Sequence, residues 1–101
     1  MIICGYTFEG PYINKNSLRD ASGIYVILDQ RTNGKLHVLD VGETGEIKTR
    51  IDGHERKEDW ERQRSGTIVF AVYYTPGWSN QQRRDLESQI RDTYSPPCGD
   101  R

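Results

Sequence analysis

The sequence predicts an α+β fold, in which helices pack against a small central antiparallel β-sheet. Three apolar segments rich in β-branched and aromatic residues predict core strands, at positions 23–29, 36–42 and 67–75. Two polar segments with apolar residues at helical spacing predict helices, at about 46–64 and 79–94. The chain has 101 residues, of which 34% are hydrophobic, so it has room for one domain with a small core.

The segments between and before the strands predict how the strands pair. The dipeptide Asn33-Gly34 is typical of a tight hairpin turn, because both residues tolerate a positive φ. We therefore expect the first two core strands to be antiparallel neighbours. The segment 67–75 is the most apolar and should lie centrally in the sheet. The first fifteen residues predict only a short, imperfect strand at an edge.

The helix expected at 46–64 is polar, with a narrow apolar side. Ile47, Ile51 and Trp60 are the residues that should face the core. Gly53 interrupts this segment, and a glycine costs a helix interior roughly 1 kcal/mol relative to alanine. The sequence therefore predicts a kink or a break at Gly53.

The last helix has the clearest start and end signals. Ser79 and Gln82 have the spacing of a capping box, in which each side chain bonds the backbone of the other. Leu86, Ile90 and Tyr94 follow at intervals of four residues and predict the buried stripe. A Pro-Pro pair directly afterwards ends the helix.

Composition excludes several classes of protein. The net charge of −1 is not that of a strongly basic, non-specific nucleic-acid binder, although a local basic surface remains compatible with it. The first residues do not have the pattern of a secretory signal, and no apolar run is long enough for a membrane span. Cys4 and Cys98 do not form a zinc-binding pair, and a disulfide between them would need an oxidising compartment. We expect a cytoplasmic protein with two reduced thiols.

Four short elements follow one another along the chain in a distinctive order. They are Gly23-Ile24-Tyr25, Asp40-Val41-Gly42, Arg50 with His54, and Glu87. Together they resemble the core of the GIY-YIG nuclease family over about positions 22–99, so 1–101 would be a single GIY-YIG-like domain. The chain departs from the family pattern at two places, since Asp40 replaces the second tyrosine and Gly99 stands where an asparagine is common.

This resemblance implies metal-dependent hydrolysis of DNA phosphodiester bonds. Glu87 would hold Mg²⁺ or Mn²⁺, which needs few protein ligands and stabilises charge on the leaving oxygen. Arg50 would bind the scissile phosphate with its planar guanidinium. Tyr25 would take the proton from the attacking water, so its pKa must lie below the usual value of about 10, with Arg50 and the metal as the causes. His54 would hydrogen-bond Tyr25 or the phosphate.

Each of these residues also has an ordinary structural interpretation. Arg50 and His54 fit a solvated helix face, and Glu87 lies four residues from both Arg83 and Arg91, as in surface ion pairs. Asp40 carries negative charge toward a phosphate site, where it could instead bind a second cation or a water. A catalytically inactive nucleic-acid-binding module and a protein–protein adaptor therefore stay open as alternatives. The small size favours a homodimer or a separate targeting partner.

Overall fold

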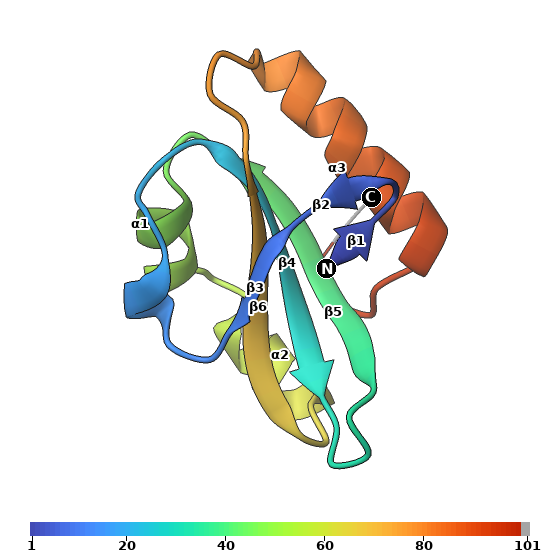
Figure 1. Cartoon of the computed structure of the whole chain (residues 1–101). Coiled ribbons are helices and arrows are strands. Elements are labelled where there is room, and N and C mark those ends of the chain that lie inside the picture. Colours follow the sequence, from blue (N-terminus) through green and yellow to red (C-terminus); the bar gives the residue numbers. More distant parts are fainter. Residues whose placement is uncertain (100–101) are drawn as a thin grey trace.

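The computed structural model describes residues 1–99, which fold into a four-stranded antiparallel sheet with helices on both faces (Figure 1). The elements in chain order are β1 (Ile2–Ile3), β2 (Tyr6–Thr7), β3 (Glu9–Tyr12), the 3₁₀ turn η1 (Lys15–Ser17), β4 (Gly23–Gln30), β5 (Leu36–Thr44), α1 (Ile47–Asp52), α2 (Lys57–Gln63), β6 (Thr67–Tyr74) and α3 (Asn80–Tyr94). The predicted α+β class is therefore confirmed.

The strand order of the sheet is β3-β6-β4-β5, and every neighbouring pair is antiparallel. The hairpin expected around Asn33-Gly34 joins β4 to β5, and Gly34 adopts the left-handed backbone that the turn requires, with φ of 85°. β6 and β4 are the two inner strands, and β3 is the short edge strand expected near the N-terminus. A second, two-stranded sheet of β1 and β2 was not predicted.

A β-bulge in β5 decides which way Asp40 points. The register between β4 and β5 shifts between Ile27 and Leu28, so that Leu39 has no partner of its own on β4. Leu39 and Ile27 belong to the same buried cluster, and Asp40 pairs directly with Ile27. The bulge therefore turns both Leu39 and Asp40 toward the face that α1 and α2 cover.

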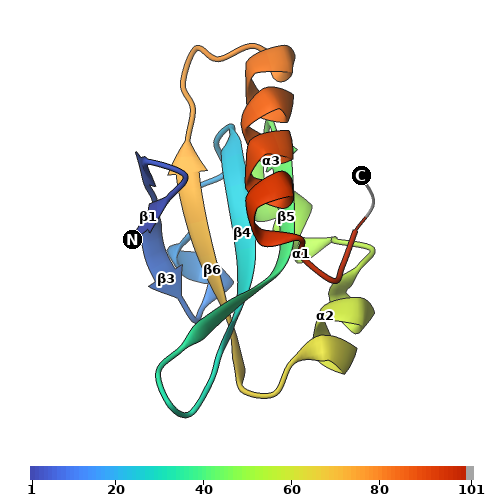
Figure 2. The ribbon, with the colours of Figure 1, turned by 90° about the vertical axis from the view of Figure 1, so that its right-hand side faces the viewer.

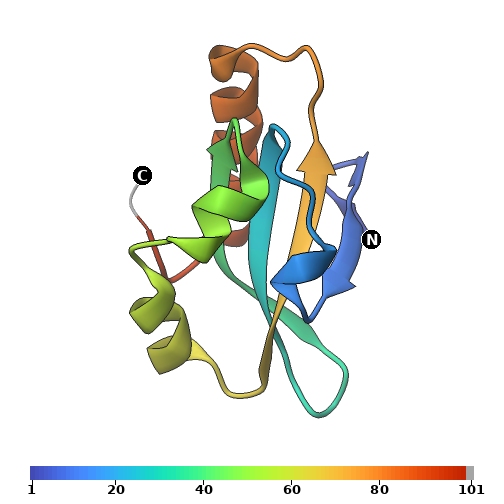
Figure 3. The ribbon, with the colours of Figure 1, turned by 90° about the vertical axis from the view of Figure 1, so that its left-hand side faces the viewer.

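Each face of the sheet has its own hydrophobic cluster. The face under α3 and the β1–β2 hairpin is shown in Figure 2, and its buried residues include Ile24, Val26 and Leu86. The opposite face, shown in Figure 3, packs against α1 and α2 through Tyr25 and Ile47. Alternate residues of β4 serve the two clusters, so this strand is buried on both sides.

The helices differ from expectation in two respects. The segment 46–64 is two short helices, which separate after Gly53, at the break that its glycine predicts. The capping box of Ser79 and Gln82 is present at the start of α3, but Tyr94 is 43% exposed instead of buried. Arg91 is buried on α3, because it reaches around the edge of β5 to a carboxylate described below.

Two further expectations concern cysteines and membranes. Cys4 and Cys98 are both free thiols, and Cys98 is buried where its N–H bonds the carbonyl of Leu39. Within residues 1–99, no helix has both the length and the apolar character needed to cross a lipid bilayer.

Candidate active site

The four residues expected at the site come from one strand, two helices and one connection, which meet at the β5 edge of the sheet. Tyr25 lies on β4, Arg50 on α1, His54 in the connection to α2, and Glu87 on α3. The structure joins two of them directly, because Tyr25 Oη lies 2.7 Å from His54 Nε2. Glu87 is close enough for its charge to raise the pKa of Tyr25, although no hydrogen bond within residues 1–99 links it to the other three.

The two glycine-containing triplets fit together in space. Tyr25 pairs with Gly42 across β4 and β5, and the phenol ring of Tyr25 lies over the bare backbone of Gly42. A Cβ atom at Gly42 would lie 2.1 Å from both Cζ and Oη of Tyr25. The ring of Tyr25 therefore occupies the space that a side chain at position 42 would need, so this position requires glycine.

The hydrogen-bond partners of His54 determine its tautomer. The backbone N–H of Arg56 donates to Nδ1 of His54 across 3.1 Å, so Nδ1 carries no proton. Neutral His54 then has its proton on Nε2 and donates it to Tyr25 Oη. Burial lowers the pKa of His54 to about 4, and the charges of Arg50 and Arg56 act in the same direction. His54 is thus a neutral donor to the phenol oxygen at pH 7.

The pKa of Tyr25 moves opposite to the direction that its expected role requires. Its side chain is only 1% exposed, and this burial raises the pKa to about 12. The positive charge of Arg50 lowers it, as expected, but less than burial raises it, and Asp40 adds a further increase. In the protein without substrate or metal, Arg50 alone therefore does not bring the pKa of Tyr25 below its usual value.

Arg50 is engaged by a neighbouring carboxylate. Its Nη1 and Nη2 donate to the two oxygens of Glu55 across 2.6 and 2.9 Å, which is the bidentate geometry of an arginine–carboxylate pair. The Arg50 side chain is one-third exposed, so its guanidinium remains in contact with solvent. Arg50 is therefore in place to bind an oxyanion, but an acidic side chain occupies the required donors.

Glu87 is the candidate metal ligand. It is about a quarter exposed, and Arg91 Nε donates to its Oε2 across 3.3 Å. Burial raises the pKa of Glu87, Arg91 lowers it, and the charges of Glu43 and Asp40 raise it further. Since this carboxylate lies among other negative charges, a cation would lower its pKa. Mg²⁺ keeps most of its waters and needs one or two carboxylates, so Glu87 fits such an ion, although no group of three or more ligands occurs within residues 1–99.

Asp40 is completely buried and fully used by protein donors. Its two oxygens accept hydrogen bonds from Arg91 Nη2 at 2.6 Å, Arg56 Nε at 2.7 Å and Trp60 Nε1 at 2.9 Å, as well as from the N–H of Val41. These contacts leave no place for the second cation or the water considered for Asp40. Instead, the residue ties β5 to both α2 and α3.

Sequence reasoning missed Glu55, Arg56 and the role of Arg91. Glu55 and Arg56 directly follow His54, so their position next to the expected pair was the available signal. Both Arg83 and Arg91 have the spacing of ion-pair partners of Glu87, and Arg91 does form this pair. Arg83 instead pairs with Glu43, whose carboxylate lies 2.9 Å from Nε of Arg83. Nothing in the sequence indicated that Arg91 would also bond Asp40, 51 residues away.

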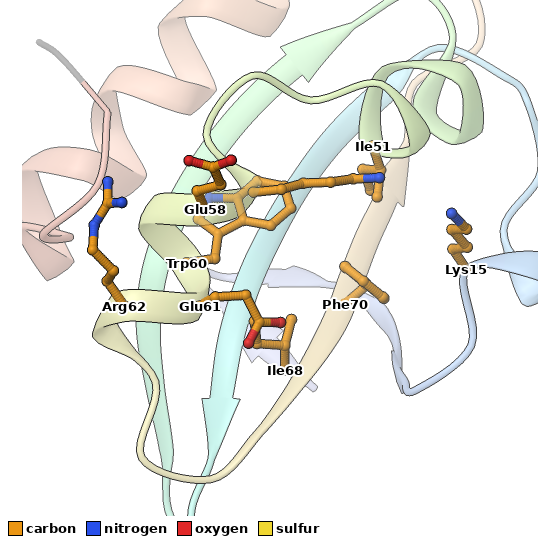
Figure 4. Close-up of a pocket in the computed structure, with 9 residues that line it drawn as sticks. Lys15, Ile51, Glu58, Trp60, Glu61, Arg62, Ile68 and Phe70 are labelled. Atoms are coloured by element: carbon orange, nitrogen blue, oxygen red, sulfur yellow. The ribbon is translucent and has the colours of Figure 1, made fainter.

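A separate groove lies on the α1–α2 face, between α2 and β6 (Figure 4). Ile51, Trp60, Ile68 and Phe70 form its apolar part, with charged side chains around them, and its volume is about 600 Å³. Trp60 connects the groove to the site, because its ring lines the groove while its N–H bonds Asp40. None of the four expected site residues lines it.

Comparison with known proteins adds no relative to this description. No protein-family model, no curated protein and no solved structure matches the chain.

Proposed function

We propose that the chain is a divalent-metal-dependent endonuclease of the GIY-YIG type, which hydrolyses DNA phosphodiester bonds in the cytoplasm. The observation that supports this most is the 2.7 Å hydrogen bond between Tyr25 and His54. This bond joins Tyr25 of the Gly-Ile-Tyr motif to His54 of the Arg50–His54 pair, next to the backbone of Gly42. A solvated helix face would not require His54 to be buried against a phenol oxygen.

In this proposal each side chain has a distinct role. Arg50 binds the scissile phosphate, and Tyr25 takes the proton of the attacking water. The Nε2–H of His54 holds the phenol oxygen in place and stabilises the phenolate that forms. Glu87 holds Mg²⁺ or Mn²⁺, which when bound supplies positive charge to the phosphate and the leaving oxygen.

The raised pKa of Tyr25 has a consequence for this role. With a pKa of about 12, Tyr25 is protonated at neutral pH in the free protein. A base in this state limits the rate through the small fraction that is deprotonated, so cleavage should accelerate as the pH rises from 7 to 9. A plateau over this range would contradict Tyr25 as the base.

A nucleic-acid-binding module without catalysis is the second candidate. It is favoured by the pairing of Arg50 with Glu55 and by the almost complete burial of Tyr25. Such a module would bind DNA with an affinity that falls as salt increases, because phosphate contacts release counterions. It would cleave no substrate in either metal.

The test is cleavage of labelled linear, flap, four-way and supercoiled DNA in Mg²⁺ and in Mn²⁺. We expect cleavage by the natural protein and its loss in Glu87→Gln, which keeps the shape of the side chain. Asp85→Asn on the same helix is the matched control, since Asp85 is exposed and its hydrogen bond goes to Gln81 of the same helix. A folded Glu87→Gln protein that still cleaves would contradict the proposal, and salt-sensitive binding without any cleavage would favour the binding module.

A further inference from the structure

The carboxylate of Glu55 occupies Arg50 in the way that a phosphodiester would. Both of its oxygens face the guanidinium fork, at 2.6 and 2.9 Å from Nη1 and Nη2. A carboxylate and a phosphate present two oxygens to arginine in the same planar, bidentate manner. The residue that the proposed function assigns to substrate phosphate is therefore already bound to an anion from its own chain.

The groups around Glu55 also suit a phosphate. Arg56 Nη1 lies 3.5 Å from Oε1 of Glu55. Two guanidinium groups thus approach the same carboxylate from different elements. The hydrogen bond from Arg50 lowers the pKa of Glu55 to about 2, so this carboxylate is charged at neutral pH.

Glu55 differs from Asp40 in how firmly its carboxylate is held. Asp40 is wholly buried and accepts bonds from three side chains, whereas the Glu55 side chain is 61% exposed. Glu55 belongs to the short connection between α1 and α2, so its side chain can rotate into water without moving either helix. Exposed ion pairs of this kind are weak, so an incoming anion can replace one of the partners.

We propose that Glu55 is a self-blocking contact, which occupies the phosphate site of Arg50 until a DNA phosphate displaces it. This inference rests on the proposed function, because it assigns Arg50 to substrate phosphate. A single free phosphate competes poorly with the tethered carboxylate, whose effective concentration is high. A DNA strand competes better, since its neighbouring phosphates add attraction to the surrounding cations. The contact therefore favours polyanionic substrates over free phosphate.

The test compares the affinity of four variants for a labelled DNA duplex by fluorescence anisotropy, without divalent metal. We expect Glu55→Gln to bind about fivefold more tightly than the natural protein, because one competing charge of an exposed pair is removed. Glu58→Gln is the control for net charge, since Glu58 is exposed and forms no ion pair within residues 1–99. It should change the affinity by less than about twofold.

A double variant tests whether the gain passes through Arg50. In the Arg50→Ala background, adding Glu55→Gln should increase the affinity for DNA by no more than Glu58→Gln does in the natural protein. Equal effects of Glu55→Gln and Glu58→Gln in the natural background would overturn the inference. A full gain in the Arg50→Ala background would also overturn it.

Titration with inorganic phosphate, followed by NMR of the arginine side chains, separates this inference from the proposed function. If Glu55→Gln binds phosphate more tightly through Arg50 and no variant cleaves DNA, the endonuclease proposal fails and the self-blocking contact stands. If the natural protein cleaves DNA and Glu55→Gln strengthens neither phosphate nor DNA binding, the endonuclease proposal stands and the self-blocking contact fails. If Glu55→Gln gains neither and nothing cleaves, both are wrong.

Discussion

Arg91 Nη2 lies 2.6 Å from Asp40 Oδ1, in an ion pair that is almost completely buried and links α3 to β5. The same guanidinium donates to the carbonyl of Cys98 at 3.0 Å and holds Glu87 at 3.3 Å. Asp40 in turn binds Arg56, which lies two residues from His54. One buried carboxylate therefore connects the helix that carries Glu87 to the segment that carries His54.

Removing this carboxylate should strongly destabilise the protein. We expect Asp40→Ala to lower the free energy of unfolding by about 3–5 kcal/mol, since it leaves a buried guanidinium without its partner. Asp59→Ala is the matched control, because its pair with Arg62 on α2 is exposed and should contribute less than about 1 kcal/mol. Urea unfolding followed by circular dichroism measures both. If Asp40→Ala does not fold, Asp40→Asn keeps the volume and still removes the charge. If both Asp40 variants lower the free energy of unfolding by no more than Asp59→Ala does, the buried network does not stabilise the fold as expected.

A methyl group at Gly42 should displace the ring of Tyr25. The Cβ of Gly42→Ala would overlap the phenol, so the ring must move and its bond to His54 must break or lengthen. Overpacking of this kind costs about 1–3 kcal/mol. Gly45→Ala is the control, because nothing lies within 4 Å of a Cβ there. Thermal unfolding should separate the two variants, and NMR should show a changed His54 resonance in Gly42→Ala only. Equal stability of the two would mean that the ring does not need this space.

His54 should make the protein sensitive to mild acid. Its pKa is about 4 in the folded protein and about 6.5 when unfolded, so the unfolded state binds more protons between these values. The free energy of unfolding should therefore decrease as the pH falls from 6.5 to 4, by up to about 3 kcal/mol from this group. Urea unfolding at several pH values measures the effect. His54→Gln should flatten this part of the curve, and parallel curves for the two proteins would contradict a buried neutral histidine.

The sheet and α3 could be predicted because their signals are local. The β-branched and aromatic residues of β4, β5 and β6 and the cap at Ser79 are signals that depend only on neighbouring residues. The β1–β2 hairpin could not be predicted, because strands of two residues have no periodicity. Ile3 and Phe8 are buried next to the sheet, so tertiary packing stabilises this hairpin.

The site was only partly predictable for a related reason. The resemblance of the short motifs to a known family was enough to expect Tyr25 near His54, and the two side chains do form a hydrogen bond. The direction of Asp40 depends on a one-residue bulge, which reverses the face of a strand residue and leaves no sequence signal. The burial of Arg91 follows from Asp40 and not from the apolar stripe of α3.

The residue at position 99 should be restricted by the same ion pair. A Cβ at Gly99 would lie 2.5 Å from Arg91 Nη2 and 2.8 Å from Asp40 Oδ1. Gly77 has nearly the same positive φ, 82° against 85°, but nothing lies near it, so Gly77→Ala is a control for backbone strain alone. Gly99→Ala should cost about 1–2 kcal/mol more than Gly77→Ala, because the backbone at position 99 must shift away from Arg91.

This shift should expose Cys98, whose backbone bonds Leu39 and Arg91. In a Cys4→Ser background, the rate at which Cys98 reacts with a thiol reagent should rise in Gly99→Ala and stay unchanged in Gly77→Ala. Gly99→Asn, whose side chain is larger than that of alanine, should raise the reactivity in the same way. An unreactive Cys98 in both Gly99 variants would mean that Asp40 and Arg91 can rearrange to accept a side chain there.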